Sequence, residues 1–230
     1  MATSEILDPP LSDRFAVALV YAVGLHRNQA RKGTGVPYAS HLLAVASLVL
    51  EHGGSEDQAI AALLHDAIED QGGPPTGDAI RKRFGDAVHA IVAGCTDAEV
   101  QPKPPWKARK EKYVAHVRLA PVSVKLVSAA DKLHNARSLL SDHRHVGEKL
   151  WKRFNASKEE TLWYYRSLVA AFRDGPQSHG LRRLVEELDR VVDELHDVSG
   201  VARADEGAAA RSAPKRRATP PGKPRPLSGS

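Results

Sequence analysis

The stretch Ala59–Gly73, which reads AIAALLHDAIEDQGG, decides what kind of fold the chain can adopt. Its apolar residues recur at three- and four-residue intervals, which is the spacing of a helix with one buried face. Four polar residues interrupt this pattern: His65, Asp66, Glu69 and Asp70. Because residues three or four apart lie over one another on a helix, we expect these side chains to share one wide sector. A neighbouring histidine and aspartate in such a sector can share one cation.

The alternative for these residues is a solvated surface near the end of the helix, since Gly72 and Gly73 follow Asp70 closely. Carboxylates in a last turn oppose the helix dipole, which favours cations at that end. Like charges one turn apart also destabilise a helix, by about a few tenths of a kcal/mol per pair. A bound divalent ion would offset both penalties, so the composition of this stretch favours a metal site.

Helical spacing continues along most of the chain up to residue 198, and alternating β-branched runs are almost absent. The expected helices are Ser12–Gln29, His41–His52, Ser55–Asp70, Gly77–Phe84, Asp86–Cys95, Lys107–Leu119, Pro121–Asp142, Glu148–Phe154, Lys158–Phe172 and His179–Asp197. Ser12 and Ser55 are expected N-caps, and the glycine pairs at 53–54 and 72–73 are expected to end helices. The sequence therefore predicts an all-α fold of about eight to ten helices.

Composition divides the chain into an N-terminal extension at 1–11, one folded domain at 12–198 and a tail at 199–230. The tail is rich in Ala, Gly, Pro and Ser and has few large apolar side chains, which predicts disorder. In Val201–Ser230, seven Lys or Arg residues and two acids account for the whole formal charge of +5. We therefore expect no specific nucleic-acid partner, although the basic tail could make weak electrostatic contacts with RNA, DNA or an acidic protein.

Cysteine usage and the chain start indicate a cytoplasmic protein. The single cysteine, Cys95, excludes an internal disulfide and a multi-cysteine zinc site. No run of about 18 apolar residues is present, so no membrane association is expected. The first ten residues, MATSEILDPP, also lack the basic and then apolar pattern of a secretory signal.

The second polar element is the loop Arg31–His41, which reads RKGTGVPYASH and precedes an apolar helix. Its cations, Arg31 and Lys32, could clamp phosphates, and Tyr38 could stack on or hydrogen-bond to a nucleotide. A hydrated loop with a histidine at a helix start would show the same pattern. This element is therefore informative only together with the others.

The third polar element is Val124–Leu140, VKLVSAADKLHNARSLL, in which Asp131 stands among small and apolar residues. Asp131, Asn135 and Ser138 are spaced to form one polar stripe on a helix. An ion pair of Asp131 with Lys132 or Arg137 is the alternative to a functional role. Neither cation lies on the same stripe, so a metal ion is the better expected partner.

These three elements together resemble the HD superfamily of metal-dependent phosphohydrolases, and more narrowly the (p)ppGpp hydrolase domain of the RelA/SpoT-homologue family. The resemblance covers roughly residues 12–175 and rests on three ordered motifs. They are R-K-x(4)-P-Y-x-x-H at Arg31–His41, H-D-x-x-E-D at His65–Asp70 and A-D-K-L-H-N-x-R-S-L at Ala130–Leu139. An HD-type helical bundle is the fold that the resemblance implies.

The resemblance also implies a role for each group of polar residues. The implied metal ligands are His41, His65, Asp66 and Asp131, with Mn²⁺ the usual ion of the family and other divalent cations possible. The implied catalytic residues, which position or deprotonate the attacking water, are Glu69 and Asp70. The implied contacts to the guanosine and its phosphates are Arg31, Lys32, Tyr38, Asn135 and Ser138. The expected reaction is hydrolysis of the 3′-diphosphate of (p)ppGpp to GDP or GTP and pyrophosphate, by a stand-alone small alarmone hydrolase.

Two departures from the family pattern concern substrate choice more than metal binding. Ser128 stands where the family commonly has a lysine, and the segment Lys32–Pro37 holds one residue more than in many members. Two other functions therefore remain open. One is hydrolysis of a different nucleotide, such as the 2′-phosphate of NADPH or a 5′-nucleotide. The other is a module that binds nucleotides without turnover, which the intact pair Glu69 and Asp70 disfavours.

The basic helix around Trp106–His116 also allows two interpretations. It could be a hydrated helix in which Glu111 pairs with its neighbours. It could instead form a basic wall beside the site that receives the distal diphosphate, with Lys112, Arg109 or Lys125 contributing.

Overall fold

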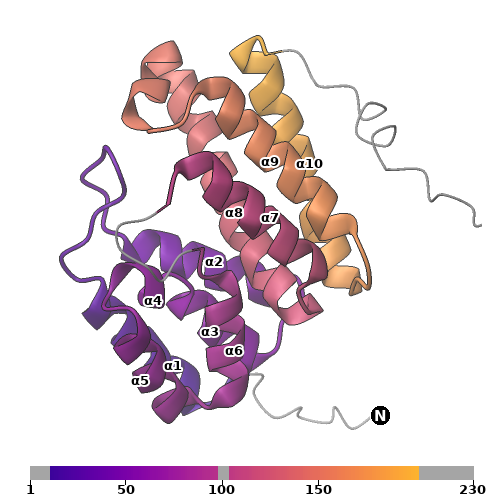
Figure 1. The fold of residues 1–230 in the computed structure, drawn as a ribbon. Helices are drawn as coiled ribbons and strands as arrows, with labels where there is room; N and C mark the ends of the chain where they lie inside the picture. The colour runs from indigo at the N-terminus through magenta and orange to yellow at the C-terminus, as the bar shows by residue number, and fades with distance from the viewer. Residues whose placement is uncertain (1–10, 98–103, 202–230) are drawn as a thin grey trace, which may run out of the picture.

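A computed structural model describes residues 11–97 and 104–201 of the chain (Figure 1). Its helices are α1 (Asp13–Leu25), α2 (Ala39–Glu51), α3 (Glu56–Leu64), α4 (Ala67–Asp70), α5 (Pro74–Phe84), α6 (Asp86–Cys95), α7 (Trp106–Leu119), α8 (Val122–Val146), the 3₁₀ helix η1 (Gly147–Arg153), α9 (Lys158–Arg173) and α10 (His179–Ser199). The only β-type pairing within these two ranges is an isolated bridge between Ala30 and Pro37. The expected all-α fold is confirmed.

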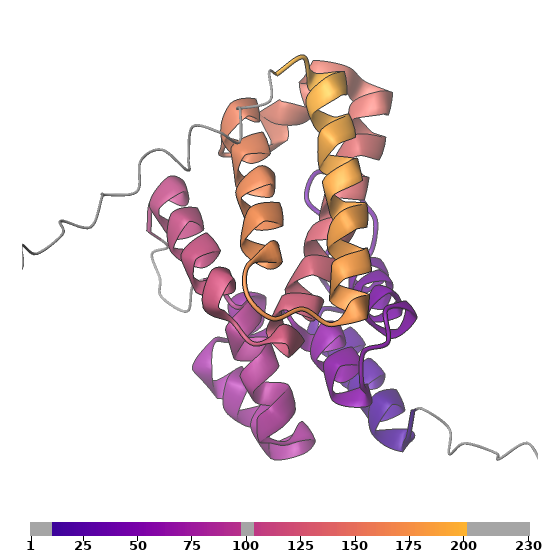
Figure 2. The same cartoon turned by 90° about the vertical axis from the view of Figure 1, so that its right-hand side faces the viewer.

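The long helix α8 connects two groups of helices. It packs against α2, α3 and α6 on one side and against α9 and α10 on the other (Figure 1). In the second group, α7 packs on α9, α9 on α10, and α10 on α8, as Figure 2 shows from the side. A helix shared in this way can place one of its residues at the boundary between the two groups.

The short helix α3 is the centre of the first group. Its six residues from Ala59 to Leu64 are all fully buried, and it packs against α1, α2, α6 and α8. Three of the six are alanines, which allow neighbouring helices to approach closely. A capping box at Ser55 begins the helix, because the Ser55 hydroxyl accepts from the amide of Gln58 while the Gln58 side chain binds back. The expected N-caps at Ser12 and Ser55 are both confirmed.

The expected single helix over Ser55–Asp70 is wrong, because the chain breaks between α3 and α4. The ring Nδ1 of His65 donates to the carbonyl oxygen of Ala62 over 2.8 Å. In a continuing helix, that carbonyl would accept from the amide of Asp66 instead. Asp66 accordingly has φ −97° and ψ −2°, and α4 begins one residue later.

Other expected bounds also need correction. The segment expected as the helix Glu148–Phe154 is the 3₁₀ helix η1, and α8 continues four residues beyond the expected end at Asp142. Helix α5 begins at Pro74, three residues before Gly77, because proline is well suited to the first turn of a helix. Gly73, at φ +65°, provides the left-handed turn from α4 into α5, a conformation that glycine adopts without strain.

The predictions for the two ends of the chain concern residues that lie almost entirely outside the described ranges. The extension at 1–11 is described only at its last residue, and the tail at 199–230 only up to residue 201. The expected disorder and the domain bounds therefore stay predictions. None of the helices in the two described ranges is both long enough and apolar enough to cross a membrane.

Candidate active site

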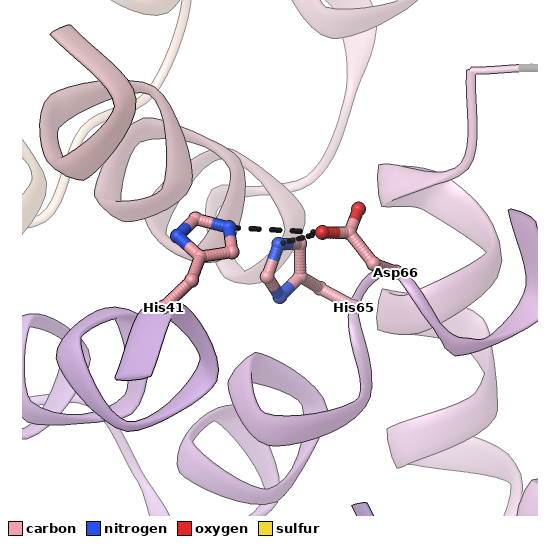
Figure 3. Close-up of side chains that lie close together, drawn as sticks. All are labelled: His41, His65 and Asp66. Carbon is pink, nitrogen blue, oxygen red and sulfur yellow. Dashed lines mark ion pairs between the residues drawn. The ribbon is translucent and has the colours of Figure 1, made fainter. Parts of the chain in front are cut away.

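Three of the expected metal ligands converge where α2 meets the junction of α3 and α4. Figure 3 shows the rings of His41 and His65 turned toward the carboxylate of Asp66. Asp66 Oδ2 lies 3.0 Å from His65 Nε2 and 3.6 Å from His41 Nε2. One ligand atom of each residue lies within 4.8 Å of the others, so together they could hold one metal ion. The break in the helix aims His65 and Asp66, which are adjacent in sequence, at the same point.

The fourth expected ligand, Asp131, reaches this group from α8. Its Oδ1 lies 3.2 Å from His41 Nε2 and 3.6 Å from His65 Nε2. Its other oxygen, Oδ2, accepts from Lys132 Nζ over 2.6 Å. The ion pair with Lys132, which the sequence left open as the alternative to a metal ion, is therefore formed through this second oxygen. A flexible four-carbon stem lets a lysine reach the residue before it, although the two lie on different helical stripes.

A hydrogen bond holds the outer ring nitrogen of each histidine. His65 Nδ1 donates to the carbonyl of Ala62, so Nε2 faces the carboxylates, and although burial opposes it, Asp66 and Asp131 hold the pKa of His65 well above its usual value. His41 Nδ1 lies 2.8 Å from Nδ1 of His134. Burial and the nearby His41 lower the pKa of His134 to about 4, so His134 is uncharged near neutral pH and can accept from His41. Hydrogen bonds to the ring nitrogen that does not face the ion orient histidine ligands in metal sites.

The buried polar atoms test whether this group fits a divalent cation. His41 Nε2 and His65 Nε2 are buried and have no hydrogen-bond partner within the part of the chain that the structure describes. Burial opposes the charge of both carboxylates, yet His65 and His41 hold the pKa of Asp66 well below its usual range. Lys132 and the same two histidines hold the pKa of Asp131 well below its usual range. Two unpartnered imidazole nitrogens and two ionised carboxylates form a donor set suited to first-row divalent metals. The residues therefore fit the ion.

Side chains of the loop and of α8 hold the two carboxylates in place. Tyr38 Oη donates to Asp66 Oδ2 and Asn135 Nδ2 donates to Asp131 Oδ1, each over 2.5 Å. Arg31 Nη2 in turn donates to Asn135 Oδ1 over 2.7 Å. Three residues that were expected to contact substrate thus also form a hydrogen-bonded layer behind the expected ligands.

The expected catalytic pair lies on α4, beside the ligands. Glu69 and Asp70 line one small pocket with Asp66 and Asp131, of about 220 Å³, which we call the acidic pocket. Glu69 Oε2 accepts from the backbone amide of Asp97 over 3.3 Å, and Asp70 Oδ2 accepts from Gln29 Nε2 over 2.8 Å. Both carboxylates are therefore held by residues from other parts of the chain.

A larger pocket of about 460 Å³, which we call the large pocket, adjoins the acidic pocket. All five expected substrate contacts line it, namely Arg31, Lys32, Tyr38, Asn135 and Ser138. Arg31, Tyr38 and Asn135 line the acidic pocket as well. The aromatic rings of Phe154 and Tyr165 complete the wall opposite the loop. The Ser138 hydroxyl donates back to the carbonyl of His134 and keeps its acceptor capacity for a ligand.

A family model described as HD domain matches residues 18–174 of the chain. The chain belongs to the HD domain family. Membership in this family agrees with the use of a divalent metal at a site built from histidine and aspartate, as the geometry of His41, His65 and Asp66 indicates.

Known relatives of this HD domain protein carry specific names. Over 122 residues it is 38% identical to guanosine-3′,5′-bis(diphosphate) 3′-pyrophosphohydrolase MESH1 of Xenopus tropicalis and 37% identical to the human protein of that name. The aligned segment is 52% of this chain and spans 65% of the length of these relatives.

A solved structure described as a metazoan ortholog of SpoT that hydrolyses ppGpp has a similar fold. Its TM-score is 0.62 at 26% identity, and the match covers 85% of this chain and 99% of that one. A structure of lmo0812 from Listeria monocytogenes gives the same TM-score at 29% identity, covering 68% of this chain and 99% of the other.

Several residues around the HD-domain site were not identified from the sequence. They are Gln29, Asp97, Lys110 and His134, which contact the expected ligands or the expected catalytic residues, or line the acidic pocket. His134 stands inside the A-D-K-L-H-N motif and could have been found there. Asp97 and Lys110 belong to no motif, so only the fold brings them to the site.

The hypothesis of a basic wall needs correction for two of its three residues. Lys125 is 1% exposed, and its Nζ donates to the carbonyl oxygens of Arg118 and Asp174, so it is a structural residue. Lys112 is exposed and lines neither the acidic nor the large pocket. Ser128, which stands in place of a lysine, is buried and shares a 2.7 Å hydrogen bond with the Tyr113 hydroxyl.

Proposed function

We propose that this HD domain protein is a metal-dependent hydrolase that removes the 3′-diphosphate of (p)ppGpp as pyrophosphate and leaves GDP or GTP. The observation that carries the proposal is the junction of the two pockets. Arg31, Tyr38 and Asn135 line both the acidic pocket and the large pocket. A nucleoside in the large pocket would therefore hold its 3′ group against the acidic pocket. The names of the relatives at 37% to 38% identity support the same substrate.

The ion would be held by His41, His65, Asp66 and Asp131, and Mn²⁺ suits this mixed set of nitrogen and oxygen ligands. A divalent ion there would supply positive charge that acidifies a water molecule and neutralises the phosphate being cleaved. Tyr38 and Asn135 keep one oxygen of each aspartate fixed, so both carboxylates are preorganised for the ion.

Glu69 and Asp70 are the proposed catalytic residues. Both line the acidic pocket, and their hydrogen bonds to Asp97 and Gln29 orient them. Their carboxylates would take a proton from the attacking water as its oxygen bonds to the phosphorus next to the ribose. The bond between that phosphorus and O3′ breaks, and O3′ receives a proton. The products are pyrophosphate and guanosine 5′-diphosphate or 5′-triphosphate.

The substrate contacts proposed in the large pocket follow from their chemistry. Arg31 and Lys32 supply positive charge for phosphates, and Arg31 also binds Asn135. Asn135 and Ser138 offer polar atoms for the ribose or the base on the α8 side. The rings of Phe154 and Tyr165 offer apolar surface to the base.

Incubation of metal-stripped protein with ppGpp tests the proposal. The assay runs with and without Mn²⁺, beside NADPH and a panel of 5′-nucleotides, and products are separated by ion-exchange chromatography. We expect GDP and pyrophosphate from ppGpp only when metal is present. Turnover of NADPH or a 5′-nucleotide but not of ppGpp would overturn the substrate assignment. Binding of ppGpp without turnover under any metal would overturn the proposed reaction.

A further inference from the structure

A third pocket, of about 260 Å³, lies beside the other two and has a different charge. We call it the basic pocket, since its lining includes Lys32, Arg109 and Lys110. Among the described residues that line it, none is acidic. Its other walls come from aromatic and small side chains of α7, α9 and the segment after η1. A pocket with three cations and no carboxylate is suited to an anion.

The basic pocket is continuous with both parts of the proposed active site. It shares Lys32, Leu139, Phe154 and Tyr165 with the large pocket. It shares Lys110 with the acidic pocket. Each pair of the three pockets therefore shares lining residues. A ligand that branches at its centre could occupy all three pockets.

Two buried polar atoms at the basic pocket have no partner within the described ranges. They are Nε of Arg109 and the hydroxyl oxygen of Tyr164, whose side chain belongs to a residue only 6% exposed. Burial raises the pKa of Tyr164, so its hydroxyl keeps its proton and can donate. An unpaired buried donor destabilises a protein unless a ligand or water satisfies it. Both residues line the basic pocket, so an oxyanion bound there has two buried donors in its walls.

Asp97 fixes the two cations of α7 without neutralising them. Its Oδ2 accepts from Lys110 Nζ over 2.6 Å and also from Arg109 Nη1. One carboxylate held between two cations leaves net positive charge beside the pocket. Lys110 Nζ also lies 4.8 Å from the centre of the Tyr164 ring, which limits its freedom. The cations are therefore positioned before any ligand arrives.

We infer that the basic pocket binds a second phosphate group of the substrate, which is carried on the 5′ side of the nucleoside and is not cleaved. The inference rests on the proposed function, because it assumes a nucleoside in the large pocket and the scissile group in the acidic pocket. Arg109 and the Tyr164 hydroxyl are the specificity-determining contacts. The pocket thereby distinguishes a nucleotide phosphorylated at both ends from one that carries only the 3′ group.

Titration calorimetry with GDP and guanosine tests the subsite without requiring turnover. We expect wild-type protein to bind GDP more tightly than guanosine, and Arg109→Ala to lose roughly tenfold or more in GDP affinity, since one charge-assisted bond to a phosphate is removed. Tyr164→Phe removes only the hydroxyl and keeps the ring, so it tests the pocket with little risk to folding. Lys112→Ala is the matched control, since it removes an exposed cation from the same helix.

The outcomes separate the subsite from the proposed function. Weaker GDP binding by both Arg109→Ala and Tyr164→Phe, with guanosine binding and Lys112→Ala unchanged, supports the subsite even if ppGpp is never hydrolysed. Equal GDP affinity in wild type and both variants overturns it, as does the absence of GDP binding by wild type. In turnover assays, the two variants should raise KM for ppGpp but not for guanosine 3′-diphosphate. An equal rise for both substrates would also overturn the subsite.

Discussion

The acidic pocket and the basic pocket share Lys110, but their charges have opposite effects on the binding of a phosphate. Five carboxylates and three cations line the acidic pocket, whereas three cations and none of the described carboxylates line the basic pocket. A phosphate would be repelled by the acidic pocket unless a divalent ion were present, and it could enter the basic pocket directly. We therefore expect the metal ion to determine the rate of ppGpp cleavage and the basic pocket to determine the affinity for the nucleotide.

Removing the metal or one of its ligands should have the largest effect. Chelation of wild-type protein, or the substitution His65→Ala, should lower ppGpp turnover roughly a thousandfold, because the ion supplies several kcal/mol of charge stabilisation. Metal analysis by atomic absorption, beside the ppGpp assay, checks this. GDP binding should persist in both cases. Loss of GDP binding on chelation would break the comparison, since both pockets would then depend on the ion.

Replacing the acidic pair should separate chemistry from metal binding within the acidic pocket. Glu69→Gln combined with Asp70→Asn should reduce kcat for ppGpp by about 10²- to 10⁴-fold, because proton transfer from water is lost. The metal content should stay near one ion per chain, and KM should change little. Unchanged kcat would remove both residues from the proposed mechanism.

The hydrogen bonds behind the ligands should have an intermediate effect. Tyr38→Phe removes the hydroxyl that donates to Asp66 and should weaken metal affinity about 10- to 100-fold. A metal titration followed by activity at saturating Mn²⁺ measures it, and excess metal should restore most of the turnover. Tyr21→Phe is the control, because its ring packs on Phe84 away from the site. Metal affinity equal to wild type would show that Asp66 needs no support from Tyr38.

The smallest effect is expected at Lys110, the residue that the two pockets share. Lys110→Met should raise KM for ppGpp, and it should also strengthen metal binding slightly, by a factor of about two to five, because a cation leaves the acidic pocket. Weaker ppGpp binding together with tighter metal binding would show that the charge of Lys110 acts in opposite directions in the two pockets. If the affinity for ppGpp and the affinity for the metal both fell, Lys110 would act through the fold instead of through its charge.

The helices and most of the site residues could be predicted because their signals are local. Helical spacing depends on which residues lie three or four positions apart, and the caps at Ser12 and Ser55 depend on near neighbours. The three motifs likewise bring the expected ligands and pocket residues to one place in the structure. The assignment of roles to those residues stays a prediction, to be tested by the experiments above.

Other features could not be predicted because they depend on which atoms particular side chains contact. The break at His65 follows from a side chain that takes a helix carbonyl, which spacing alone does not reveal. Lys125 reads as a surface cation in the sequence, yet the end of α9 provides the carbonyl that buries it. The sequence left the pairing of Lys132 with Asp131 open as an alternative, and the structure shows that it forms.

By itself, the sequence determined the all-α class and the polar motifs of this protein, since periodicity, capping and residue chemistry act over a few positions. Tertiary structure alone decided that Arg109 of α7 and Tyr164 of α9 line one pocket beside the acidic one. Apolar burial between helices is non-directional and joins segments far apart in the chain. Which polar groups then meet depends on how the whole bundle packs, and that is where the basic pocket arises.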